Sequence, residues 1–286
     1  MTTHHRHIAV DDVDVFYREA GCKNAPQIVL LHGFPTSSHM YRNLVPTLAE
    51  CYHVLAPDLP GFGFTKAPSR DLFLYRFETL TQVLERFVDK TRLGRFVLMV
   101  FDYSAPVGFR LAMRQPERIA AIICQNGNAY AEGLSGGRNP IEAYRDAPSD
   151  ANREALRQLL QAGAIKPQYT HGVHDASLVA PEAYVLDQTF IDWPERREIH
   201  LDLLLDYTSN VALYPAFQQY FRTHKPKLLA VWSRNDPFFL PPGAEAFRRD
   251  NPNAEVHFVE GGHFALETRG AEIASFILSF LSRVFA

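Results

Sequence analysis

Short apolar runs alternate with amphipathic segments through the first 128 residues, and this rhythm strongly limits the possible folds. The apolar runs have the length of buried strands and cover residues 27–31, 52–56, 95–100 and 119–127. The segments 40–50 and 77–91 instead repeat their apolar residues at helical spacing. Strands that alternate with helices predict an α/β fold, in which a mostly parallel sheet is covered by helices on both faces.

The pattern changes after residue 128. Residues 129–215 contain many polar residues, several helical stretches and few strand-like runs. Strand-like runs return at 226–232 and 254–260, and a last helix is expected near 270–284. We therefore expect a core built from residues 1–128 and 216–286, with residues 129–215 inserted as a helical cap over the carboxyl edge of the sheet. Ligands of open α/β sheets bind at that edge.

Composition excludes several classes of partner. The net charge of −3 and the pI near 6.5 argue against nucleic acid and anionic membranes, which both need a concentrated positive field. No uninterrupted apolar stretch is long enough to span a bilayer. The N-terminal segment with His4, His5 and His7 is interpreted as a solvated polar tail rather than a weak metal site.

The three cysteines point to a reducing environment. Cys22, Cys51 and Cys124 are odd in number and far apart, without CxxC spacing, which favours free thiols over a disulfide framework. The N-terminus lacks the apolar stretch of a secretory signal. These features predict a cytoplasmic protein.

The most informative segment, RFVLMVFDYSAPVGFRLAMRQPER, runs from a strand straight into a helix through a tight turn. It resembles the nucleophile elbow of the α/β-hydrolase family, and this resemblance extends over nearly the whole chain. The apex of the turn is either Asp102 or Ser104. Members of the family carry Pro-Glu-Arg fourteen residues after the nucleophile, and Pro116 stands fourteen residues after Asp102 but twelve after Ser104. We predict Asp102 as the nucleophile, although an aspartate here is also a good helix N-cap.

The remaining catalytic parts follow in the order of the family, which is nucleophile, acid, histidine. Asp236 comes after the strand PKLLAVW, where the family keeps the acid that orients the histidine. His263 follows Gly-Gly and precedes the last helix. In HGFPTSS, the backbone N–H of Phe34 is expected to form an oxyanion hole with that of Tyr103.

A carboxylate nucleophile narrows the chemistry. It attacks an sp³ carbon and forms an alkyl ester on the enzyme, which a histidine-activated water then hydrolyses. The resemblance implies two branches, the haloalkane dehalogenases and the epoxide hydrolases. Dehalogenases hold the halide with a Trp after the nucleophile and often have HGNP, where this chain has Tyr103 and HGFP. Only Trp193 and Trp232 exist, and Trp193 alone is placed as a plausible halide donor.

Epoxide hydrolases instead use two cap tyrosines that donate to the epoxide oxygen. Tyr144, preceded by Asn-Pro, and Tyr207, before Asp236, resemble these two acids. Further candidate tyrosines are Tyr130, Tyr169 and Tyr214. The elbow departs from the common His-Asp-Trp-Gly-Gly of epoxide hydrolases, because it has Phe101 and Ser104 in the first and fourth places.

We therefore expect an epoxide hydrolase without metal or organic cofactor that acts, as monomer or homodimer, on a small hydrophobic molecule. The candidate cap residues that line its apolar pocket are Phe190, Leu203, Leu204 and Phe217. The alternatives are a haloalkane dehalogenase, a serine esterase or lactonase that uses Ser104, and a relative without catalysis that only binds.

Overall fold

The computed structural model describes residues 1–135, 143–144 and 146–286, and it contains a sheet of eight strands in the order β1-β2-β4-β3-β5-β6-β7-β8. The strands are β1 (His4–Val10), β2 (Val13–Ala20), β3 (Gln27–Leu31), β4 (His53–Pro57), β5 (Phe96–Phe101), β6 (Ile119–Gln125), β7 (Leu228–Ser233) and β8 (Glu255–Val259). From β4 to β8 every pair of neighbours is parallel, whereas β2 is antiparallel to both of its neighbours. The predicted α/β class is confirmed.

Two strands at the sheet edge were not expected. His4, His5 and His7 lie in β1, which pairs with β2 along its whole length, so the prediction of a polar tail is wrong. Most of β1 is exposed, and an exposed edge strand lacks the apolar run by which the central strands are found. Backbone pairing with β2, rather than burial of side chains, holds this segment in place.

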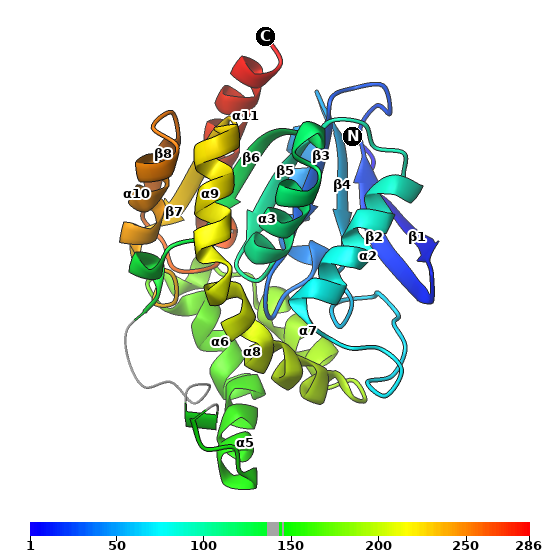
Figure 1. The fold of residues 1–286 in the computed structure, drawn as a ribbon, viewed down its shortest axis with the longest axis vertical. Helices are drawn as coiled ribbons and strands as arrows, with labels where there is room; N and C mark the ends of the chain where they lie inside the picture. The colour runs from blue at the N-terminus through cyan, green and yellow to red at the C-terminus, as the bar shows by residue number, and fades with distance from the viewer. Residues whose placement is uncertain (136–142, 145) are drawn as a thin grey trace.

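Helices cover both faces of the sheet (Figure 1). The alternation within β5 shows how, because Phe96, Leu98 and Val100 face one apolar cluster, and Val97, Met99 and Phe101 face the other. The first cluster includes side chains of α2 (Phe77–Lys90), α3 (Ser104–Arg114), α9 (Tyr214–His224) and α10 (Pro241–Asp250). The second includes those of α1 (Leu44–Leu48) and α11 (Ala265–Val284). Helix α11 has a kink at Arg269, just before the helix expected from residue 270.

The insertion between β6 and β7 is helical and gathers beyond one end of the strands (Figure 1). Its described helices include α5 (Asp150–Arg157), α6 (Ala162–Thr170), α7 (Pro181–Ile191) and α8 (Arg196–Ala212), and α9 follows them. The insertion also holds the short 3-10 helices Ala131–Gly133, Gln158–Leu160 and Ala176–Leu178, whereas Ser38–Tyr41 and Pro116–Arg118 are 3-10 helices of the core. Helix α9 packs against α3 and leads the chain back to β7. The predicted cap boundaries at residues 129 and 215 stay a prediction.

None of the helices in the described parts of the chain combines the length and the apolar character that a membrane crossing demands.

Candidate active site

Asp102 lies at the apex of the turn between β5 and α3. Its φ of +49° belongs to the left-handed region, which non-glycine residues adopt only where the surroundings enforce it. The neighbouring chain is packed against this turn, since a Cβ at Gly33 would lie 2.5 Å from the Cβ of Asp102. A Cβ at Gly127 would similarly lie 2.6 Å from the Cβ of Ala105. The turn is therefore fixed from two sides, and the packing sets the direction in which the side chain of Asp102 projects.

The carboxylate of Asp102 accepts hydrogen bonds from the backbone and lies close to the imidazole of His263. Its Oδ1 accepts a hydrogen bond of 2.6 Å from the backbone N–H of Phe34, and the N–H of Tyr103 also donates to the carboxylate. Its Oδ2 lies 3.8 Å from Nε2 of His263. Burial raises the pKa of Asp102 to about 6, although His263 and the two N–H donors favour the charged form.

His263 is oriented by Asp236. The distance from Nδ1 of His263 to Oδ2 of Asp236 is 2.8 Å, and both side chains are buried. Burial acts against the charged imidazole, but Asp236 and its hydrogen bond, together with Asp102, outweigh it and raise the pKa of His263. The predicted nucleophile, acid and base are thus brought together, and Nε2 of the imidazole faces the nucleophile.

Asp236 has further partners, one of which the sequence did not reveal. Its Oδ1 accepts hydrogen bonds from the backbone N–H groups of Phe238 and Phe239, at 2.8 and 3.2 Å. The side chain of Asn126 donates to Oδ2 over 2.6 Å. Asn126 follows β6 in an Asn-Gly pair and has a φ of +43°, so the only sequence signal was that of a turn. These donors fix the orientation of the Asp236 carboxylate beside the imidazole.

Ser104, the alternative nucleophile, is engaged with the backbone. Its Oγ lies 2.6 Å from the carbonyl oxygen of Leu31 and 2.8 Å from that of Phe101, and it accepts from the N–H of Phe101 at 2.9 Å. None of its hydrogen bonds in the described structure involves His263. Ser104 thus ties the elbow to strand β3 and gives no support to a serine mechanism.

Tyr207 faces the site from the cap. Its ring, on α8, lies 5.5 Å from the ring of Tyr103. Burial raises the pKa of Tyr207 well above its ordinary value, and both Tyr214 and Asp102 raise it further. A phenol near a carboxylate that keeps its proton in this way can donate to a reacting oxygen.

Contacts on both sides of Tyr207 fix helix α8 to the core. The carboxylate of Asp206 accepts a hydrogen bond of 2.8 Å from the N–H of Phe77, the first residue of α2. Asn210 accepts one of 2.7 Å from Arg110, a buried residue of α3. Neighbouring residues thus tether α8 to two core helices, so the position of the phenol is set by the fold.

Tyr144, the other predicted acid, is not joined to the triad by any contact in the described structure. It is partly buried, and its hydroxyl interacts with Arg153 of α5, whose guanidinium binds Glu198 at 2.6 Å. The preceding pair, Asn139 and Pro140, lies outside the described residues. The role of Tyr144 stays a prediction.

The further candidate tyrosines occupy different places. Tyr214 is buried and interacts with Tyr207 and Asn128. Tyr130 is buried beside Phe247 and interacts with Asp250, away from the triad. Tyr169 stacks on Phe264, the residue after the histidine.

Neither tryptophan indole contacts Asp102 in the described structure. Trp193 is 39% exposed and lies against Phe64 and Phe190. Trp232 is buried in β7 and donates to the carbonyl of Phe239 over 2.7 Å. The site therefore lacks the indole donors expected for a halide. Phe217, proposed above as a lining residue, packs on Phe109 of α3 instead.

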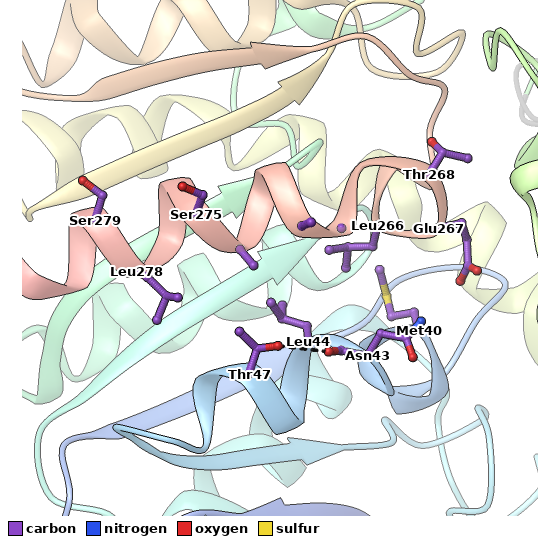
Figure 2. Close-up of a pocket in the computed structure, with 13 residues that line it drawn as sticks. Met40, Asn43, Leu44, Thr47, Leu266, Glu267, Thr268, Ser275, Leu278 and Ser279 are labelled. Carbon is purple, nitrogen blue, oxygen red and sulfur yellow. Dashed lines mark hydrogen bonds between the residues drawn. The ribbon is translucent and has the colours of Figure 1, made fainter. Parts of the chain in front are cut away.

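A separate groove of about 850 Å³ runs between α1 and α11 (Figure 2). Its walls include Met40 and Leu44 on one side and Leu266 and Leu278 on the other. None of the three triad residues lines it, so it is distinct from the candidate active site.

Comparison with known proteins agrees with this geometry. A family model described as the alpha/beta hydrolase fold matches residues 26–270. The chain belongs to the α/β-hydrolase family. The resemblance inferred from the elbow is thereby confirmed, and this α/β-hydrolase is a hydrolytic enzyme of the branch that contains haloalkane dehalogenases and epoxide hydrolases.

Two relatives cover almost the whole α/β-hydrolase chain. An uncharacterized hydrolase of Saccharomyces cerevisiae, YNR064C, is 43% identical over 95% of this chain and 94% of its own. A haloalkane dehalogenase of Mycobacterium marinum is 35% identical over 98% of this chain and 94% of its own.

Solved structures share the fold. An ancestral haloalkane dehalogenase has a TM-score of 0.81 at 22% identity and covers 98% of this chain and 99% of its own. The epoxide hydrolase CorEH has a TM-score of 0.78 at 18% identity and covers 99% of this chain and 100% of its own. Both branches therefore have the architecture of this α/β-hydrolase, and the choice between them depends on the site.

Proposed function

We propose that this α/β-hydrolase is an epoxide hydrolase that converts a small hydrophobic epoxide into a vicinal diol. The observation that carries the proposal is the pairing of a carboxylate at the elbow, Asp102, with a protonated phenol on the cap, Tyr207. A carboxylate is the nucleophile suited to an sp³ carbon, and a phenol that keeps its proton can protonate the opened epoxide oxygen.

In the first step, Oδ2 of Asp102 attacks a ring carbon while the carbon–oxygen bond of the epoxide breaks. The released oxygen takes the proton of Tyr207, and an alkyl ester of Asp102 remains. Oδ1 becomes the carbonyl oxygen of this ester and keeps its hydrogen bond to the N–H of Phe34, while the N–H of Tyr103, which also donates to the carboxylate, completes the proposed oxyanion hole.

In the second step, His263 takes a proton from water, and the resulting hydroxide attacks the ester carbonyl carbon. Negative charge develops on Oδ1, where the two N–H groups stabilise it. The bond from the carbonyl carbon to Oδ2 then breaks, and the proton on His263 passes to the departing alkoxide. The new carboxyl group supplies the proton that restores Tyr207, so one epoxide and one water give one diol.

A second candidate is haloalkane dehalogenation with the same nucleophile. The relative from Mycobacterium marinum favours it, because that protein is a haloalkane dehalogenase. The environment of Asp102 argues against it, since Tyr103 replaces the usual indole and Trp193 packs elsewhere.

A substrate comparison tests the branch. Purified enzyme is offered styrene oxide and 1-bromobutane in parallel, and diol and bromide are measured. We expect diol from the first substrate and no bromide from the second. Asp102→Asn should reduce diol formation by about 10⁴-fold or more, as loss of a nucleophile does elsewhere. Bromide without diol would identify the enzyme as a haloalkane dehalogenase. Full activity of Asp102→Asn would make Ser104 the candidate nucleophile again.

Oxygen labelling tests the covalent step. A single turnover with excess enzyme in H₂¹⁸O should leave the diol unlabelled and place ¹⁸O in the Asp102 peptide, because the diol takes Oδ2 from the protein. Label in the diol with none in the peptide would mean that water attacks the epoxide directly.

A further inference from the structure

The end of helix α6 contacts the loops that carry His263, Asp236 and the oxyanion donor Phe34. We call residues 169–173 the cap turn. It belongs to the segment between β6 and β7, and no sequence motif drew attention to it as a unit.

The first contact is with the base. The ring of Tyr169 stacks on that of Phe264 with a centroid distance of 3.8 Å and an interplanar angle of 6°. On the other side of His263 the backbones touch, because a Cβ at Gly262 would lie 2.0 Å from the carbonyl oxygen of His171. Both chain neighbours of the catalytic imidazole are thus held by the cap turn.

The second contact is with the acid. Gly172 has a φ of +75°, and a Cβ there would lie 2.3 Å from the carbonyl oxygen of Asn235. The side chain of Asn235 donates to the carbonyl of Gly172 over 3.2 Å. Asn235 directly precedes Asp236, so the cap turn fixes the backbone from which the acid projects.

The third contact is with the oxyanion loop. The hydroxyl of Tyr169 donates a short hydrogen bond to Asp187 of α7, and both side chains are buried. The hydroxyl of Thr36, two residues after Phe34, interacts with both groups, although burial raises the pKa of each above its ordinary value. Asp187 thereby anchors the aromatic ring beside the loop that supplies the oxyanion donor.

We propose that the cap turn, with Tyr169 as its principal positioning residue, aligns His263 and Asp236 for hydrolysis of the ester. The inference rests on the proposed function. Neither Oδ2 of Asp102 nor the ring of Tyr207 has a described contact with the cap turn, so formation of the ester does not depend on it. The cap then has a second role besides positioning Tyr207, because it fixes the position of His263, the base for hydrolysis of the ester.

The experiment uses Tyr169→Leu, which removes the stack on Phe264, and Gly172→Ala, which forces the turn away from Asn235. Gly163→Ala is the matched control, because it makes the same change as Gly172→Ala within α6, where no atom lies within 4 Å of the added Cβ. Ester formation and ester hydrolysis are measured separately with styrene oxide by rapid quench and mass spectrometry of the Asp102 peptide.

In both test variants we expect hydrolysis to slow by about 10-fold to 100-fold, with ester formation within about twofold of the wild type and ester accumulating on Asp102. In ¹⁵N-histidine-labelled protein, the low-field proton on Nδ1 of His263 should shift or vanish in these variants and persist in the control. Unchanged hydrolysis with an unchanged resonance overturns the proposal, and so does an equal loss of both steps in proportion to lost stability.

The resonance separates failure of this proposal from failure of the proposed function. If wild-type enzyme forms no ester with any epoxide, the function is wrong, and the resonance alone decides whether the cap turn positions His263. Tyr169→Phe keeps the stack and loses only the contacts of the hydroxyl with Asp187 and Thr36. Tyr169→Phe should therefore retain the low-field resonance of His263. If the resonance is lost in Tyr169→Phe but persists in Tyr169→Leu, the stack on Phe264 does not position His263.

Discussion

The side chain of Asp102 has to satisfy two opposed requirements. It lies in a buried position from which water is largely excluded, and this raises its pKa, yet the proposed attack on carbon requires its charged form. The donors Phe34 and Tyr103 and the imidazole of His263 restore part of the lost solvation. The result is a carboxylate that is ionised near neutral pH but carries less hydration than one at the surface.

This balance predicts an acidic limit to ester formation. The pKa of Asp102 is raised to about 6, so the charged form is present above that pH and is lost as the pH falls through it. Below about pH 6 the single-turnover rate should fall about tenfold per unit of pH. Because the pKa of Tyr207 is raised, the rate should stay level up to about pH 9. Rapid quench across pH measures both limits, and an acidic midpoint near 4 would contradict the first.

Tyr207 should act on one step only. Replacing it by Phe removes the proton donor for the epoxide oxygen, so ester formation should slow by about 10²-fold to 10⁴-fold while hydrolysis of a preformed ester is unchanged. Tyr220→Phe serves as the control, since that residue is a buried tyrosine of α9 on the core side. Equal slowing of both steps in Tyr207→Phe would mean that the phenol supports the fold rather than the chemistry.

At the scale of secondary-structure elements, the cap is attached by individual helix ends. Helix α2 begins after Arg76, whose side chain makes no capping hydrogen bond. The acceptor for its first N–H comes instead from Asp206 of α8, so one cap residue both completes a core helix and stands next to Tyr207. Capping of this kind stabilises a helix by about 1 kcal/mol.

Removing this acceptor should destabilise the protein more than removing a neighbouring surface pair. We expect Asp206→Ala to lower the free energy of unfolding by about 1–2 kcal/mol. Asp202→Ala, one turn earlier on α8, breaks partly exposed ion pairs with Arg70 and Arg153 and should cost less than about 1 kcal/mol. Urea titration of both variants gives the comparison. Equal losses would show that the bond to Phe77 contributes nothing beyond a surface interaction.

The same distinction between local and distant partners explains what the sequence could predict. The runs around Leu30, Leu98 and Ile122 were recognised as strands because burial on both faces leaves an uninterrupted apolar pattern. The elbow and the His263 segment were recognised from local spacing. Asn126 and the cap turn cannot be predicted from local sequence, because their partners are distant along the chain. Asn126 bonds to Asp236, more than a hundred residues later, and the cap turn contacts the loops of Asp236 and His263.

At the scale of the whole molecule, core and cap share one apolar cluster. It includes Leu98 and Val100 of the sheet together with Leu160, Ile165 and Leu203 of the insertion. A continuous cluster of this kind favours a single cooperative transition, because neither part keeps its buried surface when the other unfolds.

The two tryptophans make this testable, because Trp193 lies in the insertion and Trp232 lies in β7. Single-tryptophan proteins, Trp193→Phe and Trp232→Phe, each report on one part by fluorescence. After correction for the stability change in each variant, measured by circular dichroism, the two urea midpoints should coincide. An earlier midpoint for the Trp193 signal would show that the insertion unfolds on its own.

The sheet order also has a consequence for synthesis in the cell. Strand β6 pairs with β5, which precedes it, and with β7, which follows the entire insertion. While the ribosome makes the insertion, the apolar strand Ile119–Gln125 keeps one edge without a partner, and such edges recruit other chains. This interval is the period of greatest risk for aggregation of the nascent chain, and chaperones that bind extended apolar segments act on it most effectively then.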